Sequence, residues 1–194
     1  MPNLNRKTLK PMTAAPNSGV PWPPQPRGYF AIGAERMSKA LNLGNLMRSA
    51  HGFGASFTFR VGATYKAMEA HADTSKGQLH LPHYNWGNID DIVLPNGCKL
   101  VGIELIDGAI DLPSFHHPMR AAYVLGPEAG SLSQPLLDRC DYVVKIPTLF
   151  CVNVAMAGAI VMYDRVKSSA RFPERQQPLP VFPSCPKCAA GPRG

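Results

Sequence analysis

Residues 121–133 read AAYVLGPEAGSLS, and this stretch decides the class of fold. Its first six residues are small or apolar without interruption, which is typical of a strand covered on both faces of a sheet. The loop GPEAGSLS follows directly and carries a single acid, Glu128. The stretch therefore predicts a buried strand at 121–126 that runs into an exposed loop.

Four further apolar runs predict strands of the same kind. They lie near 29–33 (YFAIG), 56–61 (SFTFRV), 99–105 (KLVGIEL) and 142–146 (YVVKI). Helical periodicity alternates with these runs, and we expect helices at 43–53, at about 86–94, at 135–140 and at 153–168. Buried strands that alternate with helices predict an α/β fold, with a mostly parallel sheet and helices on both faces.

Proline and charge divide the chain into a body and two tails. Seven of the 20 prolines lie in residues 1–28 and six lie in residues 173–194. Residues 1–28 also carry a charge of +4, whereas the middle of the chain carries only +1 of the total +7. We expect a basic, proline-rich tail at 1–28, one folded domain at 29–170 and a second proline-rich tail, with a CxxC pair, at 171–194.

The basic N-terminal tail suits contact with a polyanion. Lysine and arginine near phosphates release counterions and attract without a fixed geometry. The alternative is a solvated tail that merely keeps the protein soluble. The residues expected to contact such a polyanion are Arg6, Lys7, Lys10 and Arg27.

Several classes of protein are disfavoured by the pattern. No run approaches the ~18 apolar residues of a membrane span, and the N-terminus lacks the apolar core of a signal peptide, so we expect a cytoplasmic protein. Five scattered cysteines do not form a disulfide framework. No glycine-rich phosphate-binding or dinucleotide fingerprint occurs, which disfavours a standard nucleotide-binding fold.

The helix at 43–53 raises a question about Arg48. Apolar residues recur at i, i+3, i+4 and i+7 from Leu43 onward, and Asn42 stands where a helix cap is expected. Arg48 lies off this apolar stripe. It is either a solvated arginine or a charge presented to something bound beside the helix.

Three separated segments, in order, resemble the three motifs of the SpoU/TrmH branch of the SPOUT superfamily of RNA ribose methyltransferases. The first is Asn42 with Arg48 six residues later, and the second is the strand running into YVLGPEAGSLS with Glu128. The third is IPTLFCVNVAMAGAIVMYD, a turn that enters a long helix at Asn153. The resemblance covers roughly residues 29–168. Any one of the motifs alone would be weak evidence for the family, but the three in this order with matching spacing are specific.

The resemblance implies methyl transfer from S-adenosylmethionine to a ribose 2′-hydroxyl of tRNA or rRNA. It also implies a C-terminal trefoil knot that holds the cofactor, and a homodimer with its site at the interface. The exposed backbone of the loop after 121–126 agrees with this, because N–H and C=O groups can bind an adenine edge. The implied cofactor-binding residues are Ile103, Glu104, Leu105, Leu125, Gly126, Glu128, Gly130, Ile146, Pro147, Cys151, Val152, Asn153, Val154 and Ala155.

The implied catalytic residues are Arg48, Asn42, Glu128 and Asn153. A guanidinium has a pKa above ~12 and is a poor base. We therefore expect Arg48 to grip the phosphate beside the target nucleotide and to stabilise charge on the 2′-oxygen. Asn42 would position Arg48 or the ribose, Glu128 would organise the second loop, and Asn153 would hold the third. The alternatives are a plain helix cap for Asn42 and a loop carboxylate for Glu128.

Three departures from the family pattern leave an alternative function open. Cys151 stands where family members usually have serine, and we expect it to serve as a small side chain rather than as a nucleophile. The loop at 146–153 is short, and Ala129 and Ser131 surround Gly130 where glycines are usual. The alternative is a knotted RNA-binding protein that has lost turnover.

Two groups of residues raise the question of a metal. Cys185 and Cys188 have zinc-knuckle spacing, but no second pair completes four ligands. His71, His80 and His83 cluster in sequence without acidic partners at helical spacing. We expect no metal site, although a zinc-dependent nucleic-acid module remains a rival.

Overall fold

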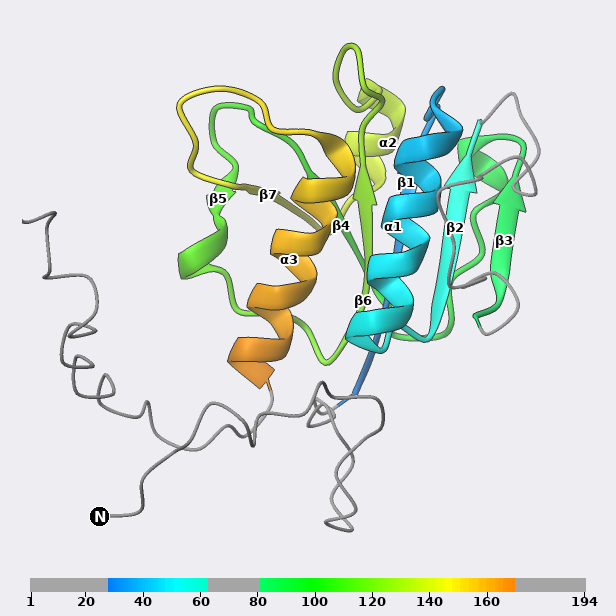
Figure 1. Cartoon of the computed structure of the whole chain (residues 1–194), viewed down its shortest axis with the longest axis horizontal. Coiled ribbons are helices and arrows are strands. Elements are labelled where there is room, and N and C mark those ends of the chain that lie inside the picture. Colours follow the sequence, from blue (N-terminus) through cyan, green and yellow to red (C-terminus); the bar gives the residue numbers. More distant parts are fainter. Residues whose placement is uncertain (1–27, 63–80, 170–194) are drawn as a thin grey trace, which may run out of the picture.

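A computed structural model describes residues 28–62 and 81–169. In this part of the chain seven strands form one sheet in the order β3-β2-β1-β6-β4-β7-β5, and every neighbouring pair is parallel (Figure 1). The predicted parallel α/β sheet is confirmed. The strands are β1 (Tyr29–Glu35), β2 (Phe57–Val61), β3 (His83–Trp86), β4 (Lys99–Ile103), β5 (Ile110–Asp111), β6 (Arg120–Leu125) and β7 (Tyr142–Lys145).

Helices cover both faces of the sheet, as predicted. α1 (Ala40–Phe53) and α3 (Val154–Ser169) lie side by side on one face, and α2 (Gln134–Arg139) lies on the other (Figure 1). A Cβ at Gly158 of α3 would collide with the side chain of Leu46 in α1. The glycine therefore allows the close approach of the two helices.

One predicted element is wrong. The expected helix at about 86–94 is instead the end of β3 followed by a single 3-10 turn at Ile89–Asp91. Tyr84 and Trp86 of β3 pack their rings against Phe57 and Phe59 of β2, which favours an extended strand at this position. The two short strands β3 and β5 were not predicted, whereas the other five strands and three helices were.

Buried Arg165 fastens the later part of α3 to the sheet. Its guanidinium donates to the backbone oxygens of Pro118, Met119 and Tyr29 at 2.7, 3.0 and 3.1 Å, and to the Tyr123 hydroxyl at 3.1 Å. The three carbonyl acceptors lie at or just before the residues where β1 and β6 begin. The first turn of α3 consequently lies at the opposite edge, over the carboxyl ends of the strands (Figure 1).

Some sequence predictions fall outside the described residues. These are the two tails up to Arg27 and from 171 onward, with Arg6, Lys7, Lys10, Cys185 and Cys188, and the histidines His71 and His80. The trefoil knot also stays an expectation. No helix in the described ranges is both long and apolar enough to cross a membrane.

Candidate active site

A pocket of about 350 Å³ lies where β4, β6 and β7 end and α1 and α3 begin. Ligand sites of open parallel sheets lie at this edge, and the volume is that of a small-molecule site. The structure brings together here every predicted cofactor-binding residue except Pro147 and Ala155. The lining residues are Lys39, Asn42, Ile103, Glu104, Leu105, Leu125, Gly126, Pro127, Glu128, Gly130, Ile146, Thr148, Cys151, Val152, Asn153, Val154 and Ala157.

Glu128 connects the loop after β6 to the start of α1. Its Oε2 accepts hydrogen bonds from the backbone N–H and the hydroxyl of Ser38, both at 2.9 Å. Its Oε1 accepts from the backbone N–H of Lys39 and from Asn42 Nδ2, both at 3.0 Å. Burial raises the pKa of this carboxyl, but the hydrogen bonds from Ser38 and Asn42 outweigh burial and lower the pKa to about 2. Glu128 is therefore an ionised anchor for the α1 N-terminus.

Asn42 does not cap α1, which corrects the prediction made from its position. The helix begins at Ala40, with Lys39 before it, so Asn42 lies buried inside the first turn. Its amide group donates to Glu128, and its Oδ1 accepts from Asn153 Nδ2 at 3.1 Å. Since a carboxylate can only accept, these two partners settle which way the Asn42 amide faces.

Asn153 completes the network and begins α3. Its Oδ1 accepts from the backbone N–H groups of Ala155 at 2.9 Å and Met156 at 3.3 Å, which is the geometry of a helix N-cap. The side chains of Glu128, Asn42 and Asn153 thus form one hydrogen-bonded chain. This chain joins a loop and the first turns of two helices at one pocket.

Two further carboxylates hold the loops of the pocket. Glu104 accepts from the backbone N–H groups of Leu105 at 3.0 Å and Leu132 at 2.7 Å, so it joins the loop after β4 to the loop after β6. Buried Glu35, at the end of β1, accepts from the backbone N–H of Ser133 at 2.8 Å. The sequence analysis did not predict Glu35 as a site residue. It could have been found, because an acidic residue just after a predicted buried strand lies at the edge of the sheet where ligands bind.

Arg48 lies apart from the pocket within a single chain. It is exposed on α1 and does not line the pocket. Arg48 lies six positions after Asn42 on α1, which corresponds to about 9 Å along the helix axis and about 240° around it. The Asn42 side chain hydrogen-bonds to Glu128 and Asn153. Its positioning of Arg48 or of the ribose stays a prediction.

Cys151 lies on the third loop of the pocket as an exposed free thiol. The Thr148 hydroxyl contacts the backbone oxygen of Phe150 at 2.9 Å and so folds this loop back on itself. The expectation that this position needs a small side chain stays a prediction.

The described part of the chain has no group of three or more histidine, cysteine or acidic side chains that could hold a metal ion. His83 instead shares a 2.9 Å hydrogen bond with the Thr58 hydroxyl. Burial, and then the nearby charge of Arg60, lower the pKa of His83 to about 4. His83 is thus a neutral, partly buried residue at the sheet edge.

Residues 29–163 match the model of the SpoU rRNA Methylase family, and the chain belongs to this family. One curated relative is a protein of Staphylococcus aureus strain COL, named as a TrmH-family tRNA/rRNA methyltransferase. The two are 29% identical over 132 residues, which is 63% of this chain and 52% of the relative. The chain therefore spans about half the length of the curated relatives it matches.

Solved structures share the fold. The AdoMet-bound rRNA methyltransferase from Sinorhizobium meliloti superimposes with a TM-score of 0.65 at 23% identity, over 75% of this chain and 58% of that chain. A structure that gives insights into the 2-OH methylation of C/U34 on tRNA superimposes with a TM-score of 0.61 at 19% identity. That match covers 73% of this chain and 96% of the other.

Proposed function

We propose that this chain transfers a methyl group from S-adenosylmethionine to a ribose 2′-hydroxyl of RNA. Membership of the SpoU rRNA Methylase family supports methyl transfer. One observation carries the proposal: the Glu128–Asn42–Asn153 hydrogen-bonded chain joins residues of three separate sequence motifs at one pocket. The RNA that we propose is tRNA or rRNA, in line with the names of the relatives.

The residues of the pocket suit S-adenosylmethionine. Apolar side chains from three strand ends, Ile103, Leu125 and Ile146, offer a surface for an adenine ring. At Gly126, which lines the pocket, a Cβ would come within 3.1 Å of the Leu132 nitrogen and 3.3 Å of Glu104 Oε2, so a larger residue would crowd the loop that Glu104 holds. When bound, the cofactor supplies an electrophilic methyl group. The protein's part is to bind it and to align the acceptor.

Alignment of the acceptor requires rigid loops around the pocket. Three carboxylates hold these loops by hydrogen bonds. Glu35, Glu104 and Glu128 each bind backbone N–H groups of loops that surround or support the pocket. Hydrogen bonds donated to a charged acceptor are about twice as strong as those between neutral groups. We propose that these carboxylates preorganise the loops and take no proton from the ribose.

We propose that Arg48 acts on the RNA side of the reaction, at the interface of a homodimer. The outer face of α1 and α3 carries Leu41, Met156 and Tyr163, which are 63%, 59% and 59% exposed. A second copy packed on this face would cover these apolar side chains beside both the pocket and Arg48. Sedimentation should give a dimer for the unchanged chain and a monomer for Tyr163→Glu. A monomer in both cases would contradict the dimer.

Cofactor binding is the first experimental test. Titration calorimetry with millimolar S-adenosylmethionine should show binding, and S-adenosylhomocysteine should compete. Absence of both would refute the cofactor assignment.

The second test is product analysis. Purified protein is incubated with methyl-labelled cofactor and unmodified tRNA or rRNA, and the RNA is digested to nucleosides. A 2′-O-methyl nucleoside is expected, and a base-methylated one would refute ribose transfer. Cofactor binding with no product on any RNA would favour the non-catalytic alternative. Mapping 2′-O-methyl sites in cells with and without the gene would then identify the target.

A further inference from the structure

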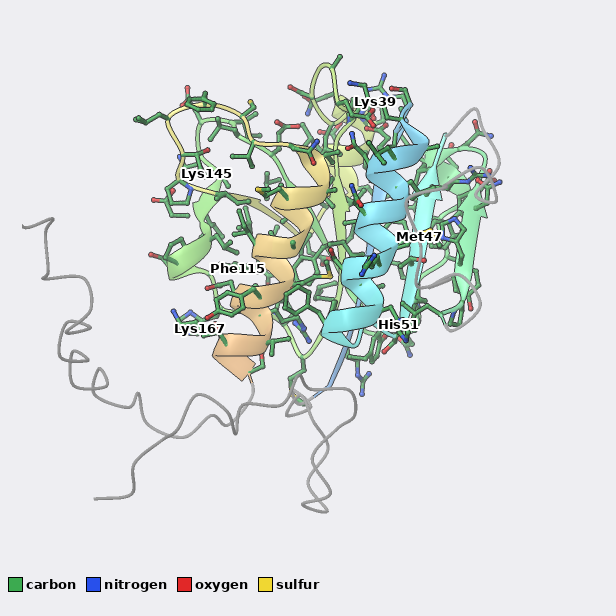
Figure 2. All side chains as sticks on the ribbon, in the orientation of Figure 1. Lys39, Met47, His51, Phe115, Lys145 and Lys167 are labelled. Atoms are coloured by element: carbon green, nitrogen blue, oxygen red, sulfur yellow. The ribbon has the colours of Figure 1, made fainter. Side chains whose placement is uncertain are left out.

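Lys39 was not predicted as a site residue, yet it is the single basic residue among those that line the pocket. The other charged lining residues are Glu104 and Glu128. Lys39 is exposed and immediately precedes α1. Figure 2 shows it at the end of α1 that lies over the carboxyl ends of the strands. The one positive side chain of the pocket thus lies at its rim.

The two carboxylates of the pocket are bound by other groups. Glu104 accepts hydrogen bonds from two backbone N–H groups. Glu128 accepts four hydrogen bonds, which come from Ser38, Lys39 and Asn42. Within residues 28–62 and 81–169 the Lys39 ammonium group forms no ion pair. The pocket therefore contains two carboxylates whose hydrogen-bond partners are neutral protein groups, and one cation with three donors to offer.

The backbone of Lys39 is hydrogen-bonded, whereas its ammonium group has no ion pair among the described residues. Its N–H donates to Glu128 Oε1 at 3.0 Å, which keeps the start of the side chain beside the loop after β6. A lysine stem spans several ångströms and carries a compact charge that can follow a ligand. Arg48 lies nine residues further along α1, about 13 Å along its axis and on its opposite side. Arg48 therefore does not duplicate Lys39 within one chain.

We propose that Lys39 binds an oxyanion group of the ligand in this pocket. The proposal rests on the proposed function, which supplies two sources of such a group. S-adenosylmethionine carries a carboxylate, and RNA carries a phosphate at each nucleotide. Lys39 is then a binding and positioning residue that orients whichever group it holds relative to the pocket.

The test compares Lys39→Gln, Lys39→Arg and a matched control, Lys167→Gln. Lys167 is an exposed lysine near the other end of α3, far from Lys39 (Figure 2). Calorimetry measures affinity for S-adenosylmethionine and for its decarboxylated analogue. A salt titration measures binding of unmodified RNA.

Each source of the oxyanion predicts its own result. If Lys39 binds the carboxylate, Lys39→Gln weakens S-adenosylmethionine about tenfold and leaves the decarboxylated analogue unchanged, and Lys39→Arg restores most of the affinity. If Lys39 binds a phosphate, Lys39→Gln leaves cofactor affinity unchanged. The slope of log RNA affinity against log salt then becomes flatter by roughly 0.7 to 0.9, which is the contribution of one phosphate contact. Lys167→Gln should change neither the cofactor affinity nor this slope.

The outcomes separate this proposal from the proposed function. If the unchanged protein binds S-adenosylmethionine and RNA, but Lys39→Gln behaves like Lys167→Gln in both titrations, the role of Lys39 is wrong and the function stands. If the unchanged protein binds neither ligand, the proposed function fails, and the Lys39 proposal fails with it.

Discussion

The Asn42 side chain donates to Glu128 Oε1 over 3.0 Å, although the two residues lie 86 positions apart in the chain. The same amide accepts from Asn153 Nδ2 at 3.1 Å. An aspartate at this position could not replace Asn42, because an ionised carboxylate cannot donate to Glu128. Asn42 therefore couples the loop after β6 to the first turn of α3.

Glu128→Gln should lower the free energy of unfolding at pH 7 by about 1 kcal/mol, because an ionised acceptor is lost from the α1 N-terminus. The folded-state pKa of Glu128 is about 2, below its ordinary value of 4.5. A lowered pKa gives stability that is present above the unfolded value and lost as pH falls towards 2. Urea unfolding of both proteins between pH 7 and pH 2.5 should show the gap closing below about pH 4.5. A gap of constant size would contradict this, and Asp107→Asn, on an exposed loop, is the control.

Asn42→Ala and Asn153→Ala should not be additive. Each single variant loses the hydrogen bond between Asn42 and Asn153 and leaves the remaining amide without this partner. The double variant loses the same hydrogen bond only once. A double-mutant cycle on the free energy of unfolding should give a coupling of about 0.5–1.5 kcal/mol. The matched control is Asn42→Ala with Asn85→Ala on β3, for which additivity is expected. Equal coupling in the two cycles would mean that the hydrogen bond is not its source.

Arg48→Ala should abolish methylation while cofactor affinity stays nearly intact, because the side chain lies away from the pocket in its own chain. Arg48→Lys should restore little activity, since a point charge lacks the planar fork that binds a phosphate. Methyl-transfer rates and calorimetry on the same preparations check both points. Near-normal turnover in Arg48→Ala would leave Arg48 as a surface residue of α1 without a catalytic role.

Cys151→Ser should remain active. The thiol lines the pocket on a short loop, where we expect a need for a small side chain and not for a thiolate. The measurement is the methyl-transfer rate, with circular dichroism to establish that the variant is folded. Complete loss of activity in a folded variant would revive a nucleophilic role for Cys151.

The N-terminal tail should add RNA affinity without chemistry. Residues 1–28 carry +4, and each phosphate contact contributes roughly 0.7 to 0.9 to the slope of log affinity against log salt. A shortened chain that starts at Gly28 should therefore bind RNA with a slope flatter by as much as ~3. Cofactor affinity should not change. Identical salt slopes for the two chains would show that the tail is passive.

The sequence by itself determined which segments form the main strands and three of the helices. Uninterrupted apolar runs such as 121–126 have one stable place, the interior of a parallel sheet, and that preference is local. The location of the pocket followed from the same argument, because parallel strands bring their carboxyl ends to one edge. Most of the pocket residues were predictable for that reason, together with the motif resemblance.

Only the tertiary structure decided the relationships between distant segments. β3 is a strand and not a helix because Tyr84 pairs with Phe59 of β2, a partner that the local pattern does not reveal. Asn42 looked like a helix cap until its partners, 86 and 111 positions away, were in place. Lys39 joined the pocket because Glu128 holds its backbone there. In each case the deciding energy comes from contacts made after the chain has folded back on itself, and short-range periodicity carries no record of them.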